Sequence, residues 1–185
     1  MQCIESENKP IFYLINMDEY GNEELEILEI NNIINDEKNW IESTCGMSKQ
    51  LVMNKKVRIS KYYSIRAYLI IPDDIQILLN TLSLKPIEFG RFIKYDIGGM
   101  FRKHKDAKNP NVADYEHTHY LLLYFAGDYE GGDLIVYNDS GNERIVVHAG
   151  STYKYVILKL GVFHESTKIE RGNKYLYKLA LYRKR

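Results

Sequence analysis

Short apolar runs recur at close intervals through the second half of the chain, and this pattern limits the possible folds more than any other feature. From Lys85 onward the runs are rich in Val, Ile, Leu, Tyr and Phe, and Gly, Asn and Asp separate them. They read IEFGRFIKYDIGG, HTHYLLLYFAG, GGDLIVYN, ERIVVHAG, STYKYVILKL and NKYLYKLALYR. Such residues favour strands, and the gaps leave little room for helices. The pattern predicts an antiparallel double-sheet core, either a sandwich or a barrel.

The first part of the chain is mixed. Lys9 to Met17 favours a strand, and the apolar spacing within residues 23–44 fits an amphipathic helix that Trp40 anchors to the core. Residues 57–71 favour a strand or extended chain, and Pro72 followed by two aspartates predicts the start of a helix. No repeat or flexible linker divides the 185 residues, so we expect one domain. The fold class predicted is α+β, mainly β, with an N-terminal helical and strand support over about residues 1–84 and the β core over residues 85–185.

Composition excludes several classes of function. Lys plus Arg and Asp plus Glu number 25 each, so the chain as a whole has no charge that would attract nucleic acid or an anionic membrane. No apolar run is long enough to span a membrane, and MQCIESENKP lacks the features of a secretory signal. Cys3 and Cys45 are too few for a disulfide framework or a zinc site. We therefore expect an intracellular, cytoplasmic protein without a membrane partner.

Other features of the sequence are weaker guides. Abundant Ile, Asn, Lys and Tyr are typical of AT-rich genomes, including those of large DNA viruses. The basic run from Arg183 to Arg185 is explained by a solvated chain end as well as by a binding patch. Motifs for phosphate-binding loops, dinucleotide binding and the serine-hydrolase elbow are missing, so nucleotide binding and hydrolysis have no support. Nothing in the sequence indicates an oligomeric state.

His104 and Asp106 form a His-x-Asp pair within YDIGGMFRKHKD. Residues two apart on an extended segment point to the same face, so an imidazole and a carboxylate can reach one ion. By itself the pair is close to what chance would give. His164, after the strand-like run STYKYVILKL, can complete a face of two histidines and one carboxylate. This ligand set is typical of non-haem Fe(II) oxygenases, because it leaves coordination positions open for substrate and O₂.

His117 and His119 offer a competing metal motif, because a His-x-His pair also occurs in cupins. The glutamate that usually follows it in cupins is missing after His119. We interpret both histidines as substrate-channel or surface residues at the start of a strand, and His148 as structural.

Taken in order, these residues resemble the motif set of the 2-oxoglutarate- and Fe(II)-dependent dioxygenases, in their prolyl 4-hydroxylase-like branch. The family pattern Y-x-x-G-G-x-F-x-x-H-x-D is matched by Tyr95, Gly98, Gly99, Phe101, His104 and Asp106. Later landmarks of the family are matched by Gly131, Gly132, Gly150 and His164. The resemblance covers roughly Arg58 to Tyr182, beginning with the R-x-S of Arg58 and Ser60, and its motifs are specific only as an ordered set. It implies a double-stranded β-helix, or jelly-roll, with His104, Asp106 and His164 as catalytic iron ligands.

The resemblance also implies a cosubstrate site. Lys174, in the sequence Gly-Asn-Lys, resembles the lysine that holds the far carboxylate of 2-oxoglutarate in collagen-type prolyl hydroxylases. A buried carboxylate needs a cation, and Arg171 and Lys178 lie close enough in sequence to be alternatives to Lys174. Tyr124 and Tyr95 resemble tyrosines that line the same pocket, although both also suit an ordinary core.

The implied function is an Fe(II)-dependent dioxygenase that converts 2-oxoglutarate and O₂ into succinate and CO₂ while it hydroxylates a substrate, with ascorbate as an optional reductant. The motif match is to peptidyl-proline hydroxylases, so the expected partner is a protein or peptide, with proline as the target. Tyr182 stands where collagen-type enzymes often have a histidine, and this leaves a lysyl residue, a free amino acid or nucleic acid as alternative substrates. Nucleic acid is disfavoured by the neutral charge and by the lack of the R-x-N-x(5)-R ending of the demethylases. A catalytically inactive binding module is a further alternative, although it would not need all these ligands.

Overall fold

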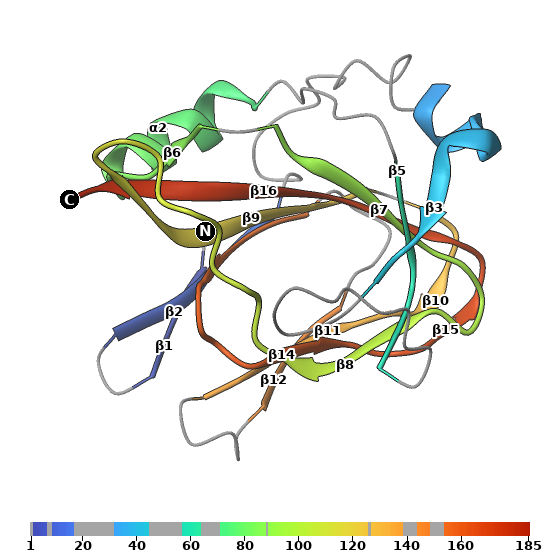
Figure 1. The fold of residues 1–185 in the computed structure, drawn as a ribbon. Coiled ribbons are helices and arrows are strands. Elements are labelled where there is room, and N and C mark those ends of the chain that lie inside the picture. Colours follow the sequence, from blue (N-terminus) through green and yellow to red (C-terminus); the bar gives the residue numbers. More distant parts are fainter. Residues whose placement is uncertain are drawn as a thin grey trace.

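Two facing antiparallel β-sheets form the body of the protein (Figure 1). The computed structural model describes residues 2–6, 9–16, 32–44, 57–63, 71–87, 89–125, 127–138, 144–148 and 154–185. The expected class, a mainly β fold with a jelly-roll core, is confirmed.

The larger sheet has nine strands. Along one path they run in the order β1 (Gln2–Ser6), β2 (Lys9–Asn16), β13 (Lys154–Lys159), β9 (Tyr115–Tyr124), β16 (Lys174–Lys184), β7 (Arg91–Tyr95), β5 (Lys61–Tyr63) and β3 (Trp40–Glu42). The short strand β6 (Lys85–Pro86) pairs with β16. The longest strands, β9 and β16, therefore lie at the centre of this sheet.

The smaller sheet faces the larger one and contains five strands. Their order is β12 (Arg144–Val147), β11 (Leu134–Tyr137), β14 (His164–Ser166), β8 (Met100–His104) and β4 (Arg58–Ile59). A further pair, β10 (Glu130–Gly131) with β15 (Ile169–Arg171), lies apart from both sheets in the pairing pattern. All these pairings are antiparallel, as the punctuated apolar runs predicted.

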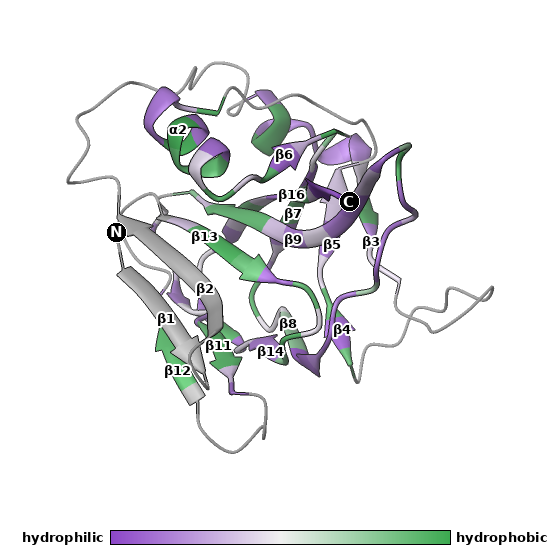
Figure 2. Ribbon diagram, turned by 90° about the vertical axis from the view of Figure 1, so that its left-hand side faces the viewer, coloured by the Kyte–Doolittle hydropathy of each residue, from purple (hydrophilic) through white to green (hydrophobic). Residues whose placement is uncertain are grey.

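Both faces of the larger sheet are buried at its centre, which explains why its strands read as nearly continuous apolar runs. On β9, Leu121 and Leu123 point to one face, while Leu122 and Tyr124 point to the other. The first pair packs against Ile75 and Leu79 of helix α2 (Asp73–Thr81), and the second pair belongs to the core between the two sheets. Figure 2 shows α2 lying over the larger sheet, next to the hydrophobic strand β13.

Helix α2 begins where the sequence predicted. Pro72 occupies the N-cap position, and Asp73 and Asp74 lie in the first turn. The backbone N–H of Ile75 donates to the carboxylate of Asp74 over 2.8 Å, which satisfies one of the free amides of the helix start. Within the described part of the chain, no helix is both long and apolar enough to cross a membrane.

The N-terminal region contributes strands to both sheets. The strand expected over Lys9 to Met17 is β2, and the extended segment after residue 57 forms β4 and β5. Only the end of the helix expected within residues 23–44 falls among the described residues: residues 32–35 are helical and a 3-10 turn, η2 (Glu37–Asn39), follows. Trp40 then starts a strand instead of ending a helix, because its backbone pairs with Tyr63. Its ring still packs into the core, 5.5 Å from that of Tyr63, as expected.

We expect Leu121→Ala to lower the free energy of unfolding by about 2–5 kcal/mol, because Leu121 is 0% exposed and its truncation leaves a cavity between the sheet and α2. Urea denaturation followed by circular dichroism measures this loss. Ile77→Ala is the control, since Ile77 on the outer side of α2 is 65% exposed and should change the free energy by less than about 0.5 kcal/mol. Equal effects of the two substitutions would contradict this packing.

Candidate metal centre and cosubstrate pocket

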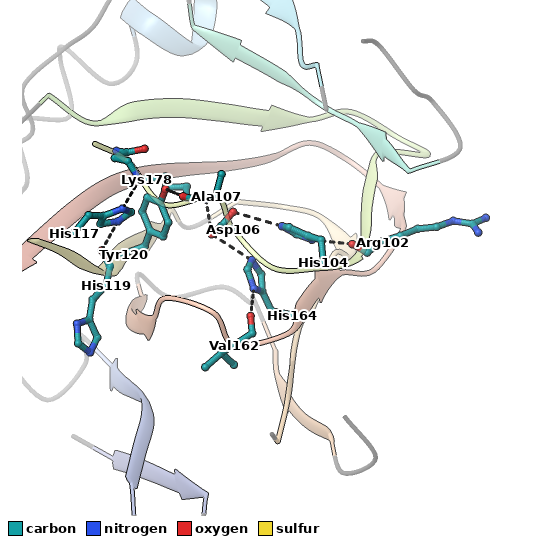
Figure 3. A network of polar contacts seen from close by, with 11 residues as sticks. Arg102, His104, Asp106, Ala107, His117, His119, Tyr120, Val162, His164 and Lys178 are labelled. Atoms are coloured by element: carbon teal, nitrogen blue, oxygen red, sulfur yellow. Dashed lines mark hydrogen bonds and ion pairs between the residues drawn. The ribbon is translucent and has the colours of Figure 1, made fainter. Parts of the chain in front are cut away.

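The smaller sheet brings two histidines together. His104 ends β8 and His164 begins β14, and the two are direct partners across this strand pair, with ring centroids 4.3 Å apart. Asp106 follows β8, and its carboxylate turns back between them (Figure 3). Its two oxygens lie 3.6 Å from Nε2 of His104 and 3.5 Å from Nε2 of His164. One donor atom from each residue fits within 4.8 Å of the other two.

The orientation of both imidazoles suits metal ligation. Nδ1 of His104 lies 2.8 Å from the carbonyl oxygen of Arg102, and Nδ1 of His164 lies 3.1 Å from that of Val162. A carbonyl can only accept, so each Nδ1 carries the proton and each Nε2 keeps its lone pair toward Asp106. Nε2 of His104 is buried without a hydrogen-bond partner among the described residues. A buried acceptor of this kind fits a metal ion, which would take the lone pair, better than an ordinary polar core.

Charge and burial set the protonation of the centre. Burial opposes ionisation of Asp106, but the ammonium of Lys178, 2.6 Å away, holds the pKa of Asp106 well below its usual range. Burial lowers the pKa of His164 to about 4, against the attraction of Asp106. The site therefore presents a carboxylate and a neutral imidazole at physiological pH, as metal ligation requires.

Lys174 lies in the same pocket as the two histidines, on the opposite sheet. It is fully buried on β16, and Nζ donates to Ser166 Oγ over 2.9 Å and to the carbonyl oxygen of Gly132. Burial lowers the pKa of Lys174 to about 7, although Asp133 acts in the opposite direction. Among the described residues no carboxylate lies within ion-pair distance of Nζ. The result is a buried cation without a direct anionic partner.

Gly132 makes room for this lysine. It adopts a left-handed backbone conformation with φ of +71°, and an added Cβ would lie 2.3 Å from Ile169 and 3.1 Å from Cδ of Lys174. A side chain here would collide with the wall of the pocket and press on the lysine.

The two predicted tyrosines surround Lys174. Nζ lies 5.3 Å from the ring centroid of Tyr95 and 4.9 Å from that of Tyr124. Both tyrosines are buried in the core between the sheets, and both also line the pocket. Each of them is therefore a core residue and a pocket residue at once. Burial raises the pKa of each phenol above its usual value, so both are uncharged.

The two alternative cations both have carboxylate partners. Arg171 is half exposed and forms ion pairs with Asp128 and Glu130, outside the pocket lining. Lys178 lines the pocket, but its ammonium contacts Asp106. Of the three candidates, Lys174 is the one placed deep in the pocket without a carboxylate beside it.

The remaining histidines do not join the centre. His117 and His119 lie near the start of strand β9, as expected, but both are buried, so their interpretation as surface residues is wrong. His117 accepts a hydrogen bond from the backbone N–H of Asn109 over 2.8 Å, and its other ring nitrogen lies 3.0 Å from the carbonyl oxygen of His119. It thereby supports the loop that follows Asp106. His148 is largely exposed and contacts Asp133 over 3.2 Å.

Sequence reasoning did not foresee the pairing of Lys178 with Asp106. A signal was present in NKYLYKLALYR, where Lys174 and Lys178 lie four residues apart in a strand that is otherwise mostly apolar. Residues four apart on a strand share a face, so a lysine beside Lys174 in this register had to enter the same interior. The partner could not be read from sequence, because it depends on the facing sheet.

Solved structures with a similar fold show which class of fold this is. No protein-family model and no curated protein matches the sequence. A Pseudomonas putida prolyl-4-hydroxylase is 17% identical with a TM-score of 0.61, over 95% of this chain and 93% of that one. A prolyl hydroxylase of Trichoplax adhaerens, in complex with a hypoxia inducible factor peptide fragment, is 16% identical with a TM-score of 0.65, over 93% and 83%. A viral collagen prolyl hydroxylase of Paramecium bursaria Chlorella virus-1, in its 2-oxoglutarate complex, is 12% identical with a TM-score of 0.56, over 94% and 96%.

The chain therefore has the fold of the 2-oxoglutarate- and Fe(II)-dependent oxygenases. Within that class its similarity extends to prolyl hydroxylases along almost the whole chain.

The unpaired charge of Lys174 predicts a pH dependence of stability. The pKa of Lys174 is about 7 in the folded protein and has the ordinary lysine value of 10.5 when unfolded, so between these values the unfolded chain holds more protons. The contribution of Lys174 to the unfolding free energy should therefore rise with pH from about 7 to about 10.5, by up to about 1.4 kcal/mol per unit. Lys174→Met removes this contribution. Urea unfolding of both proteins without ligands should give a wild-type minus variant difference that increases with pH, and parallel curves would contradict it.

Proposed function

We propose that this protein is an Fe(II)- and 2-oxoglutarate-dependent dioxygenase that hydroxylates a proline residue of a protein or peptide and releases succinate and CO₂. The observation that carries the proposal is the shared pocket of His104, His164 and Lys174. A metal-ligand cluster lies at one sheet and a buried cation at the other. Together they match the two ends of a dicarboxylate that chelates a metal with one end.

At the metal end, His104, Asp106 and His164 are the proposed ligands of Fe(II). Their chemical types favour this ion, because imidazole and carboxylate suit iron and three ligands leave positions open. When bound, Fe(II) would supply the activation of O₂ and the oxidative decarboxylation of 2-oxoglutarate. The carbonyl groups of Arg102 and Val162 hold the imidazoles in the ligating tautomer, and Lys178 holds the carboxylate of Asp106.

At the other end, Lys174 is the proposed partner of the far carboxylate of 2-oxoglutarate. Its ammonium is compact and already desolvated, so a carboxylate would gain a strong charge-assisted hydrogen bond. Tyr95 and Tyr124 line the pocket around the ammonium of Lys174. Leu134 and Leu176 add apolar surface that excludes water. O₂ is the expected oxidant, and ascorbate is an optional reductant in the assay.

The substrate assignment draws on the structural neighbours. Three of them are prolyl hydroxylases, and one of these is in complex with a peptide fragment. These similarities support a peptidyl substrate.

Replacing any one of the three ligands by Ala should abolish succinate formation, with and without substrate, because two ligands do not hold Fe(II) in this pocket. Succinate release under air measures turnover. Under anaerobic conditions, Fe(II) with 2-oxoglutarate should give a weak visible charge-transfer band in the wild type and none in His164→Ala. His148→Ala is the matched control, since this exposed histidine lies outside the cluster. Normal turnover in His164→Ala would contradict the proposed ligand set.

Lys174→Ala should raise the apparent KM for 2-oxoglutarate by about tenfold or more, because the far carboxylate loses its buried partner. Steady-state succinate formation at increasing 2-oxoglutarate measures this. Arg171→Ala is the control and should leave the KM unchanged, since Arg171 lies outside the pocket. A KM that responds to Arg171 and ignores Lys174 would reverse the assignment.

A further inference from the structure

A second pocket opens next to the proposed metal centre. It is a groove of about 380 Å³, a size typical of ligand sites, and it shares Arg58, Ile93 and Lys178 with the pocket that contains the histidines and Lys174. Its wall is formed by residues of β4, β7, β9 and β16 together with the loop after Asp106. A molecule in this groove would therefore lie beside the proposed metal ligands.

Three cations line the groove, and the sheet geometry explains why they meet there. Lys178 shares the inner face of β16 with Lys174, and Arg91 is its direct partner on β7. Arg58 comes from β4 of the facing sheet. The three side chains come from three different strands and line one opening.

Only one of the three cations of this groove has a carboxylate partner among the described residues. The ammonium of Lys178 is paired with Asp106 over 2.6 Å. The guanidinium of Arg91 lies 4.9 Å from the ring of Tyr62, and that of Arg58 lies 4.6 Å from the ring of Phe101. Among the described residues neither guanidinium pairs with a carboxylate, and none of those that line the groove is acidic. Nε of Arg58 donates to Ser60 Oγ over 2.7 Å, and a guanidinium has further N–H groups for another acceptor.

The groove also has an apolar side. Phe89 is 42% exposed at its edge, and Pro110 and Tyr120 contribute to its wall. Cations beside exposed aromatic surface suit a ligand that combines acidic and apolar groups.

We propose that this groove binds acidic side chains that flank the target residue of a peptide substrate, with Arg91 and Arg58 as their partners. The proposal rests on the proposed function and adds a sequence preference to it. A peptide is favoured over nucleic acid because the groove has three basic side chains, in a chain with no net charge. A polyanion would need a longer basic track to gain affinity by releasing counterions.

Binding of short peptides to the intact protein tests this directly. The probes are fluorescein-labelled Ala-Glu-Pro-Glu-Ala and its analogues with Gln or Lys in place of Glu, with Fe(II) and 2-oxoglutarate present and O₂ excluded. The acidic peptide should bind about tenfold more tightly than the Gln peptide, as two partly solvated charge pairs would give. This preference should weaken as salt is added. Fluorescence anisotropy measures each dissociation constant.

Two substitutions of Arg91 connect the preference to the groove. Arg91→Gln should remove most of the preference, and Arg91→Glu should shift it toward the Lys peptide, because the charge at that position is reversed. Lys159→Glu is the matched control: it makes the same charge change at an exposed position of β13, away from the groove, and should leave the preference intact. A change in preference that is no larger in Arg91→Glu than in Lys159→Glu would overturn the proposal.

Admission of O₂ separates the two proposals. A mass gain of one oxygen on the acidic peptide supports both. Tight binding of the acidic peptide without any mass gain supports the groove and contradicts the proline assignment. Hydroxylation that is equally fast with the Gln peptide overturns the groove proposal and leaves the dioxygenase intact. Tighter binding of an eight-nucleotide dT strand, or equally tight binding of inorganic phosphate, would also overturn the peptide preference.

Discussion

Placing charged groups between two β-sheets is the constraint on which the rest of this structure depends. The inner face of β16 carries Lys174 and Lys178 among apolar residues, and both ammonium groups have left bulk water. A buried charge without a partner is strongly unfavourable. Lys178 has its partner in Asp106, whereas the acceptors that Lys174 has in the described part of the chain are both neutral. Of these two charges, one therefore has an anionic partner within the described part of the protein and the other does not.

Apolar packing around the larger sheet makes it possible to bury these charged groups. Both faces of the larger sheet are covered at its centre, one by α2 and one by the smaller sheet. Apolar packing on these two faces therefore stabilises the strands that carry the site. Rigid strands then fix the positions of side chains that come from distant parts of the sequence: His104 faces His164, and Arg91 faces Lys178. Sites built on strands are held more precisely than sites on loops. Asp106 is the exception, and the neighbouring loop is supported by the hydrogen bond from Asn109 to His117.

Much of this could be predicted from the sequence, and the reasons for the rest are physical. The punctuated runs predicted the sheets, because strand residues and turn residues act locally. The ordered motifs brought His104, Asp106, His164 and Lys174 into one hypothesis, and the structure brings them around one pocket. The strand β14 was missed because HES is short and polar and is a strand only through its neighbours β11 and β8. His117 and His119 were misplaced because the spacing of two polar residues does not reveal whether a covered sheet buries them.

The convergence of the three cations in the groove could not be predicted from the sequence either. Arg91, Lys178 and Arg58 lie in three separate strands, and their convergence follows from cross-strand register and from the facing of two sheets, which a single sequence does not encode locally.

The difference in burial between the two cationic ends suggests a division of roles. Lys174 has already lost its water, as its pKa of about 7 reflects, so a carboxylate that reaches it gains most of the attraction without further desolvation of the lysine. Arg91 is exposed, so an anion there gains less and competes with water and salt. A deep, desolvated cation suits one invariant dicarboxylate, and a shallow, solvated cation suits a variable segment of chain. The same elementary charge, placed at two depths of one sheet, can therefore separate tight recognition of a cosubstrate from permissive selection of a substrate.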